Sequence, residues 1–209
     1  MSNQSRPYRM KRRAELEEQT RLRIAESAME LHEEVGPART SISAVAERAG
    51  VQRSTVYRHF PDEAALFGAC SSHWRSLNPP PNPGEWAAIR DPRERTAAAL
   101  RDLYAFYART EGMYTSLLRD EPLVPIVQRL LRDFYGYLDA IRDVLMAGRG
   151  LRGRPARRTR AAIGHALAFP TWRSLARDQG LAEEDAVALM CALVDGAAEG
   201  SRPRRAARR

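Results

Sequence analysis

Residues 40–60 of the chain read TSISAVAERAGVQRSTVYRHF, and this stretch decides the fold. Apolar residues recur at helical spacing over residues 42–49 and again from about 53 to 59, with Gly50 between the two runs. Glycine adopts a left-handed turn conformation at little steric cost. Ala46 is small, as the crossing point of two close helices requires. The predicted core that holds the two helices together consists of Ile42, Val45, Val51 and Val56.

The second predicted helix leaves a polar face turned away from this core. Its side chains are hydrogen-bonding or cationic types, which suit the edges of DNA bases and phosphate groups. They are Gln52, Arg53, Ser54, Thr55, Tyr57, Arg58 and His59. An ordinary helical hairpin with a polar surface would have the same spacing, so the pattern alone leaves both interpretations open.

The wider motif resembles the DNA-binding domain of the TetR/AcrR family, over residues 14 to about 75. The family pattern has a helix ending at glycine, then Thr-(Thr/Ser)-(Val/Ile), Ala-x-x-Ala-Gly-Val and (Thr/Ser)-(Leu/Val)-Tyr-x-(His/Tyr)-Phe. This chain matches it with Gly36, TSI at residues 40–42, AERAGV at 46–51 and TVYRHF at 55–60. The resemblance implies phosphate contacts by Thr40 and Ser41. It also implies that Arg53, Ser54 and Thr55 face the major groove, while Tyr57 and His59 bind the DNA backbone.

One position departs from the family pattern. Family members often carry a lysine that grips phosphate at the start of the fourth helix, where this chain has Glu63. An acid there complements the helix dipole but repels DNA, so we expect this contact to be absent. Arg58 or the basic N-terminus could compensate.

Charge is distributed unevenly along the sequence. The net charge is +8, yet sixteen basic residues lie in three acid-free segments: 1–13, 149–160 and 202–209. The remainder has 18 basic and 26 acidic residues, a balance of −8. We expect residues 1–13 to form a basic arm that adds phosphate affinity without sequence preference. The arginine-rich ends could instead serve solubility alone.

Helical periodicity and the positions of glycine, proline and capping residues divide the rest of the chain into predicted helices. No segment shows the alternation typical of strands. Residues 78–84 are proline-rich and predicted to be non-helical, and 148–160 a mobile loop. The predicted fold is all-α, with an N-terminal three-helix helix-turn-helix domain at 14–77 and a C-terminal helical bundle for ligand binding and dimerisation at 85–199. A basic tail follows at 200–209. The predicted helices cover 14–34, 42–49, 53–59, 63–77, 91–110, 113–119, 123–147, 159–177 and 182–198.

The last two predicted helices also resemble the C-terminal part of a TetR subgroup, in which such helices pair with their symmetry mates. The final helix has a broad apolar face, formed by Ala186, Leu189, Met190, Leu193, Val194 and Ala197. We therefore expect a homodimer through residues 159–198, although burial within one chain would explain the same face. Pro170 is expected to kink its helix.

Aromatic residues are dense between residues 104 and 138, and more follow later. Aromatic walls with a few polar tips suit a small apolar or aromatic ligand, and the family usually has such a pocket. An aromatic stripe is also typical of plain core. The candidate ligand-binding residues are Tyr104, Tyr107, Met113, Tyr114, Leu117, Leu118, Phe134, Tyr137, His165, Phe169 and Trp172.

Enzymatic signals are weak. Residues 148–153 match G-x-G-x-x-G literally, but no strand precedes them. Residues 32–34 lack the second histidine of a zinc protease, and G-x-S-x-G does not occur. Cys70 and Cys191 lack metal-type spacing and are expected to be reduced, buried thiols. No apolar run is long enough to cross a membrane, and the N-terminus has no secretory signal.

The sequence therefore predicts a cytoplasmic, non-enzymatic transcriptional regulator without cofactor or metal. We expect it to bind a palindromic double-stranded operator as a homodimer and to act as a ligand-responsive repressor. The alternative is a constitutive or architectural DNA-binding regulator that needs no inducer.

Overall fold

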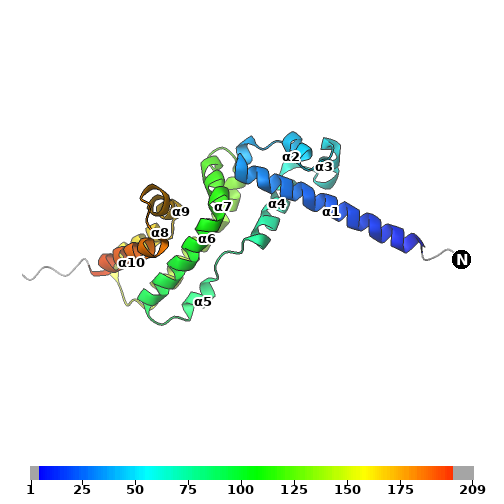
Figure 1. The fold of residues 1–209 in the computed structure, drawn as a ribbon. Helices are drawn as coiled ribbons and strands as arrows, with labels where there is room; N and C mark the ends of the chain where they lie inside the picture. The colour runs from blue at the N-terminus through cyan, green and yellow to red at the C-terminus, as the bar shows by residue number, and fades with distance from the viewer. Residues whose placement is uncertain (1–4, 200–209) are drawn as a thin grey trace, which may run out of the picture. The chain divides into compact units, whose positions relative to one another are not determined.

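The computed structural model describes residues 5–199, and every regular element in this range is a helix (Figure 1). The prediction of an all-α fold is confirmed. The chain divides into two compact units. The N-terminal unit is the chain up to Pro79 together with Gly112–Leu131, and the C-terminal unit is Pro80–Glu111 with the chain from Arg132 onward. The predicted basic tail, 200–209, lies outside the described residues.

The N-terminal unit is built on four helices and a short turn of 3₁₀-helix. They are α1 (Ser5–Glu34), η1 (Pro37–Arg39), α2 (Ile42–Arg48), α3 (Arg53–His59) and α4 (Glu63–Leu77). The end of α6 (Pro92–Asp120) and the start of α7 (Pro125–Met146) also belong to this unit. The C-terminal part of α1 packs against α2, α3 and α4.

The predicted core of the helix-turn-helix is present. Val45 and Val56 are completely buried, and Val51 packs against the same cluster. Ala46 is 3% exposed, which fits its predicted place at the helix crossing. The cluster continues into α1 and α4 through Ile24, Ala28, Leu31, Phe60, Leu66 and Cys70. Apolar burial of this kind stabilises the orientation of α3 relative to the rest of the unit.

The local signals that set the ends of these helices are also confirmed. Ser41 caps α2 by accepting a hydrogen bond from the N–H of Ala44 at 3.1 Å. Asp62 caps α4 by accepting from the N–H of Ala65 at 2.7 Å. Gly50 has φ of 64°, in the left-handed region that its place in the turn requires.

The C-terminal unit contains the remaining helices and most of α6 and α7. They are α5 (Pro83–Ala87), α8 (Gly153–Leu167), α9 (Phe169–Arg173), a π-helical segment η2 (Ser174–Asp178) and α10 (Glu183–Glu199). Helices α8 and α10 pack against each other, and α9 follows α8 after a single extended residue, Ala168.

Several predicted boundaries are wrong. Helix α1 begins at Ser5 rather than at residue 14, so most of the predicted arm is helical. Helix α6 runs unbroken through Gly112, where a break was expected. A Cβ on Gly112 would come within 2.7 Å of Glu33 Oε1, so the Glu33 side chain lies directly over this glycine. Pro83 begins α5, capped by Asn82, within a stretch predicted to be non-helical.

The region around Pro170 differs from the predicted kink. Helix α8 ends at Leu167, Ala168 is extended, and Pro170 lies in the first turn of a separate helix. Because proline has no N–H, it cannot continue the hydrogen-bond ladder of α8 but is well suited to a first turn. The predicted kink is therefore a complete break.

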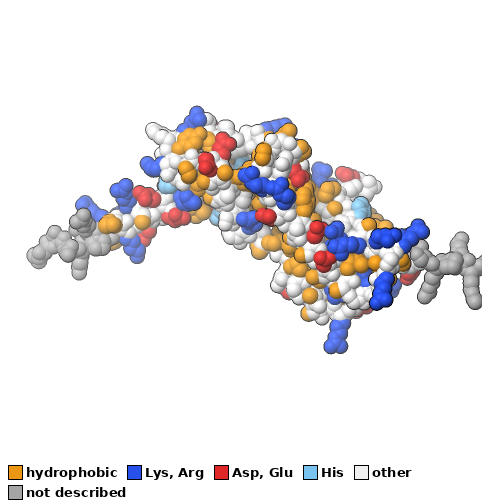
Figure 2. Space-filling view, turned by 180° about the vertical axis from the view of Figure 1, so that it is seen from behind, with side chains coloured by type: hydrophobic (Ala, Val, Ile, Leu, Met, Phe, Trp, Pro, Cys, Tyr) orange, Lys and Arg blue, Asp and Glu red, His pale blue; other side chains and the backbone are white. Residues whose placement is uncertain are grey.

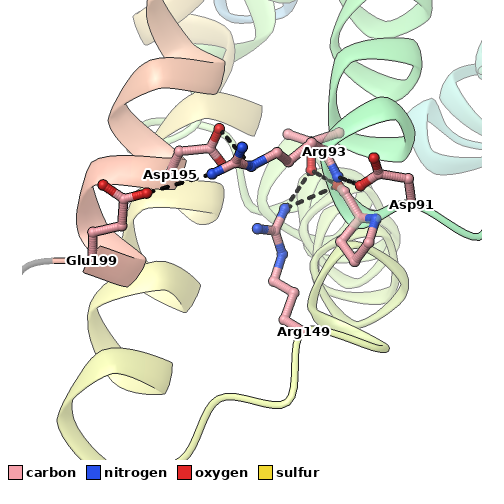
Figure 3. A network of polar contacts seen from close by, with 7 residues as sticks. Asp91, Arg93, Arg149, Asp195 and Glu199 are labelled. Atoms are coloured by element: carbon pink, nitrogen blue, oxygen red, sulfur yellow. Dashed lines mark hydrogen bonds and ion pairs between the residues drawn. The ribbon is translucent and has the colours of Figure 1, made fainter.

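The arginine-rich loop is also shorter than predicted, because α8 begins at Gly153. Arg149 is anchored in it, donating to Pro92 O at 3.1 Å and to Thr96 Oγ1 at 2.6 Å (Figure 3). Arg93, one residue into α6, pairs with Asp195 at 3.2 Å and Glu199 at 3.5 Å on α10. These contacts tie the start of α6 to the end of α10 and to the loop after α7.

Candidate functional site

Helix α3 presents a polar face from a rigid base. Among residues 53–59 only Val56 is buried. The side chains of Gln52, Arg53, Ser54, Tyr57 and Arg58 are exposed, while Thr55 and His59 are half-buried. Gln52 is the N-cap residue, but its side chain makes no capping hydrogen bond. The predicted base-reading and backbone-binding residues therefore share one short helix, most of them open to solvent.

Arg21 of α1 holds the end of this helix. Its guanidinium donates a 3.0 Å hydrogen bond to the main-chain carbonyl of His59 and lies 4.5 Å from the centre of the Phe60 ring. Phe60 itself is 1% exposed. A cation over an aromatic face adds to the burial of the ring. The sequence analysis missed Arg21, since only the fold brings a residue 38 positions away to the end of α3.

The burial of one ring nitrogen of His59 limits which atom can contact DNA. Its Nε2 atom is buried and has no hydrogen-bond partner among the described residues. A contact between the His59 ring and DNA would therefore use Nδ1.

The start of α2 offers two hydroxyl groups. Ser41 is exposed, and its Oγ accepts the capping bond, so its own proton remains available to a phosphate oxygen. Thr40 donates its hydroxyl proton to Gly36 O at 2.9 Å, which fixes the side chain and leaves oxygen lone pairs as acceptors. Ser41 is thus the better phosphate donor of the two.

The N-terminal part of α1 carries exposed basic side chains. Arg9, Lys11 and Arg12 are exposed, and Arg13 pairs with Glu17 at 3.1 Å. Figure 2 shows Lys and Arg side chains along this part of the helix, with acidic ones among them. No described side chain from residue 8 to 23 is buried, and Tyr8 is 66% exposed. A helical stretch without packing is marginal by itself in water, so binding a partner would stabilise it.

Glu63 is exposed at the first position of α4, beside the capping Asp62. Its carboxylate complements the start of the helix, as predicted. The absence of a phosphate contact at this position stays a prediction.

The structure brings five of the candidate ligand-binding residues into one aromatic cluster. The Tyr107 ring lies 5.3 Å from Phe169, 5.8 Å from Trp172 and 6.4 Å from Phe134, measured between ring centres. Phe134 in turn stacks with Tyr137 at 6.0 Å. Such distances are typical of favourable aromatic pairs.

Two tyrosine hydroxyls connect this cluster to the break after α8. Tyr104 donates to Ala166 O at 2.9 Å, and Tyr107 donates to Leu167 O at 2.7 Å. These carbonyls belong to the end of α8, where a helix lacks its own donors, and Pro170 has no N–H to offer. Burial also raises the pKa of Tyr104 well above its usual range. In this conformation both tyrosines belong to a packed core.

The other ligand candidates lie elsewhere. Met113, Tyr114 and Leu117 are buried in the N-terminal unit, where the Tyr114 ring contacts Trp74 at 6.0 Å. Leu118 is half-buried in the same unit. His165 is exposed, with Nδ1 3.4 Å from Thr171 Oγ1. The predicted set is therefore divided between the two units.

The prediction of two buried thiols is right for Cys70 and wrong for Cys191, which is half-buried, although burial raises the pKa of the Cys191 thiol as well. Cys70 is buried with its Sγ 3.5 Å from His32 Nδ1, and burial raises the pKa of the thiol to about 11. Burial also lowers the pKa of His32 to about 4. Within residues 5–199, no group of three potential metal-ligating side chains comes together, and no helix is long and apolar enough to span a membrane.

A comparison with models of protein families identifies the domain that carries this polar face. Residues 24–70 match the model of the tetR family of bacterial regulatory proteins, which spans the core of α1, the helix-turn-helix and the first half of α4. The chain carries a TetR-family DNA-binding domain. A search of curated proteins found no match to the sequence.

Solved structures of TetR-family and other transcriptional regulators share the fold at low sequence identity. A TetR-like regulator from Rhodococcus sp. RHA1 is 16% identical, covering 87% of this chain and 97% of its own, with a TM-score of 0.63. NalD of Pseudomonas aeruginosa, the secondary repressor of the MexAB-OprM efflux pump, is 21% identical (86% and 96% covered, TM-score 0.57). FadR of Bacillus subtilis, in complex with stearoyl-CoA, is 20% identical (87% and 99% covered, TM-score 0.54).

The match of residues 24–70 indicates the broad class of activity. The chain is a DNA-binding transcriptional regulator, and regulators of the TetR family bind DNA as dimers. They are not enzymes, which agrees with the prediction from the sequence. The TetR-type domain explains why the exposed side chains of α3 are polar while its opposite side is apolar.

Outside the matched domain, the apolar face of α10 is divided. Ala186, Val187, Met190 and Val194 are buried within the unit. Leu189 and Leu193 are 48% and 42% exposed, one helical turn apart. Ala188 and Ala192 extend the same exposed surface. One side of the predicted apolar face is therefore buried in the interior of the unit, and the other side forms an exposed apolar stripe.

Proposed function

We propose that the protein is a homodimeric, ligand-responsive repressor that binds a palindromic operator. The observation that carries this proposal is the exposed polar face of α3, held by a buried core and by Arg21. A recognition helix must keep its side chains in register with base edges, so a rigid base is as necessary as the side chains themselves.

The proposed division of labour on DNA follows from position on the helices. Arg53, Ser54 and Thr55 occupy the first turn of α3, the part of a recognition helix that reaches base edges. Gln52 precedes them with a free amide. The remaining contacts would go to phosphates, from Ser41, Tyr57, Arg58 and His59, and from Thr40 once its hydroxyl turns away from Gly36 O.

We propose that α8 and α10 form the dimer interface within residues 159–198. The support is the exposed stripe of Leu189 and Leu193 with Ala188 and Ala192 beside them, because small and apolar residues allow two helices to approach closely. A two-fold axis beside this stripe would bury it on both subunits. Leu189→Glu with Leu193→Glu should give a monomer by light scattering, whereas Arg154→Glu, on an exposed arginine of α8, should leave the dimer intact.

The sensor site is proposed at the aromatic cluster around Tyr107. Tyr107, Phe169 and Trp172 are packed together, so a ligand would enter by displacing α9, which is joined to α8 only through the extended Ala168. A π-helical segment directly after α9 also suits a region that rearranges. The stearoyl-CoA bound to FadR and the repressor role of NalD support small-molecule sensing and repression in proteins of this fold.

The experiment that tests the proposal measures linkage between ligand and operator. Apolar and aromatic compounds, with stearoyl-CoA among them, are screened by thermal shift. Each compound that binds is then titrated with and without operator DNA. An inducer must weaken operator binding by the same factor by which operator weakens its own binding. A compound that binds tightly at this cluster, yet leaves operator affinity the same at saturation, would contradict the sensor assignment.

A further inference from the structure

The turn between α1 and α2 is fastened to the end of α6 by one carboxylate and one guanidinium. Asp120, 2% exposed, accepts a hydrogen bond from the N–H of Ala38 at 3.0 Å. It also pairs with its neighbour Arg119, whose Nε lies 2.7 Å from Asp120 Oδ1. Arg119 Nη2 then donates to Val35 O at 2.8 Å. Two adjacent residues of α6 thereby hold both sides of the turn at Gly36.

Gly36 makes this fastening possible. Its φ of 91° lies in the region that favours glycine, and a Cβ there would fall on the Arg119 guanidinium and the Asp120 carboxylate. Backbone conformation and close approach thus require glycine independently. Further back along α6, Ser116 Oγ donates to Glu33 O at 3.0 Å. The last two turns of α6 therefore lie against the end of α1, and we call the set Ser116, Arg119 and Asp120 the α6 latch.

The latch is charged in a way that favours its closed state. Hydrogen bonds from Arg119, and then from the Ala38 N–H, lower the pKa of Asp120. Asp120 is therefore ionised at neutral pH, and hydrogen bonds to an ionised acceptor are the stronger kind. Because the carboxylate is buried, removing its partners would leave an uncompensated charge in the interior.

The constraint continues from the turn into the helix-turn-helix. Thr40 donates to Gly36 O at 2.9 Å, and Ser41 directly after it caps α2. Helix α2 shares its core with α3. The end of α6 and the recognition helix therefore belong to one connected unit, and α6 itself is continuous from Pro92.

We propose that the α6 latch determines which half-site spacing the dimer accepts. This inference rests on the proposed function, a dimer on a palindrome. Recognition helices of such a dimer must enter grooves about 34–36 Å apart, one helical turn of DNA. Two helix-turn-helix domains that are fastened to α6 can fit only one half-site spacing well. Helix-turn-helix domains with a weakened latch adapt more readily to neighbouring spacings, because fewer contacts, among them that of Trp74 with Tyr114, then hold them to α6.

The test uses the palindrome selected by the wild-type protein and two versions with one base pair added or removed at its centre. Affinity for all three duplexes is measured for the wild type, Asp120→Ala and Arg119→Gln. We expect the wild type to lose on the order of tenfold or more at the altered spacings, and the latch variants no more than about threefold. Asp139→Ala, which removes an ion pair with Arg142 in the C-terminal unit, is the matched control and should behave as wild type.

Spacing discrimination separates positioning from stability. A variant that is only less stable loses affinity for all three duplexes by the same factor, and its thermal unfolding accounts for that loss. If Asp120→Ala does not fold, Arg119→Gln decides, because it keeps the carboxylate and its bond to Ala38. Latch variants that fold and keep the wild-type ratio between spacings would overturn the inference. A wild-type protein indifferent to spacing, or selecting no palindrome, would overturn the proposed function itself.

Discussion

The hydroxyl of Tyr107 donates a 2.7 Å hydrogen bond to the carbonyl oxygen of Leu167, the last residue of α8. Both groups are buried, and Leu167 O has lost its helical donor because the chain turns away at Ala168. Tyr107→Phe would leave this carbonyl unsatisfied. We expect a loss of about 1–3 kcal/mol in the free energy of unfolding, measured by urea denaturation. Tyr57→Phe, at an exposed tyrosine, is the control, and equal stability of the two variants would contradict the account.

The second prediction concerns base reading by α3. Alanine at Arg53, Ser54 and Thr55 together should reduce discrimination between the operator and a scrambled duplex, since each good base contact is worth about 1–3 kcal/mol. Binding is measured by fluorescence anisotropy at fixed salt. Arg75→Ala with Ser76→Ala, on an exposed part of α4, should leave discrimination as in the wild type. If the triple variant remained as selective as the wild type, another surface would have to read the DNA.

The third prediction uses the helical form of the arm. At about 100° per residue, Arg9 and Arg12 lie about 60° apart, whereas Lys11 lies about 160° from Arg9. A helix that meets phosphates with one face therefore cannot use all three. If the Arg9 face meets DNA, Arg9→Gln with Arg12→Gln should reduce the slope of log affinity against log salt by about 1.8, at about 0.9 per contact.

Lys11→Gln is the matched control on the same helix and should change the slope little. Equal decreases from all three positions would show that the arm does not bind as the helix seen in the structure. An unchanged slope in every variant would show that it does not touch DNA at all.

The fourth prediction concerns acid stability. Burial lowers the pKa of His32 from 6.5 to about 4, against an opposing influence of Asp120. The unfolded chain therefore binds this proton at higher pH than the folded chain, and stability falls as the pH drops from 6.5 towards 4. The size of this loss is on the order of 3 kcal/mol.

His32→Leu should flatten the decrease in melting temperature between pH 7 and pH 4.5, while His165→Gln, at an exposed histidine, should not. Parallel curves for the wild type and His32→Leu would show that His32 is not the group responsible.

Local chemistry made much of the N-terminal unit predictable. Ser41, Gly50 and Asp62 each act within a few residues of their own position, as cap, turn and cap. The apolar spacing of Val45 and Val56 likewise depends on a single helix pair. Such features follow from propensity and geometry, which a sequence displays directly.

Features that depend on distant packing were not predictable. Gly112 resembles a helix breaker until Glu33 is seen against it. Asp120 accepts a hydrogen bond from the N–H of Ala38, which lies 82 positions away in the sequence. No local sequence pattern at either residue predicts that hydrogen bond. The candidate ligand-binding residues are divided between the two units for the same reason. Aromatic density along the sequence does not show which aromatic residues belong to which unit.

The central claim, sequence-specific binding of DNA by a symmetric pair of α3 helices, is tested most directly by selecting bound duplexes from a random pool with the full-length protein. We predict enrichment of a palindrome whose half-sites are centred about one helical turn apart, or a multiple of it. Recovery of a pool with no enriched sequence, or of a motif without two-fold symmetry, would contradict it.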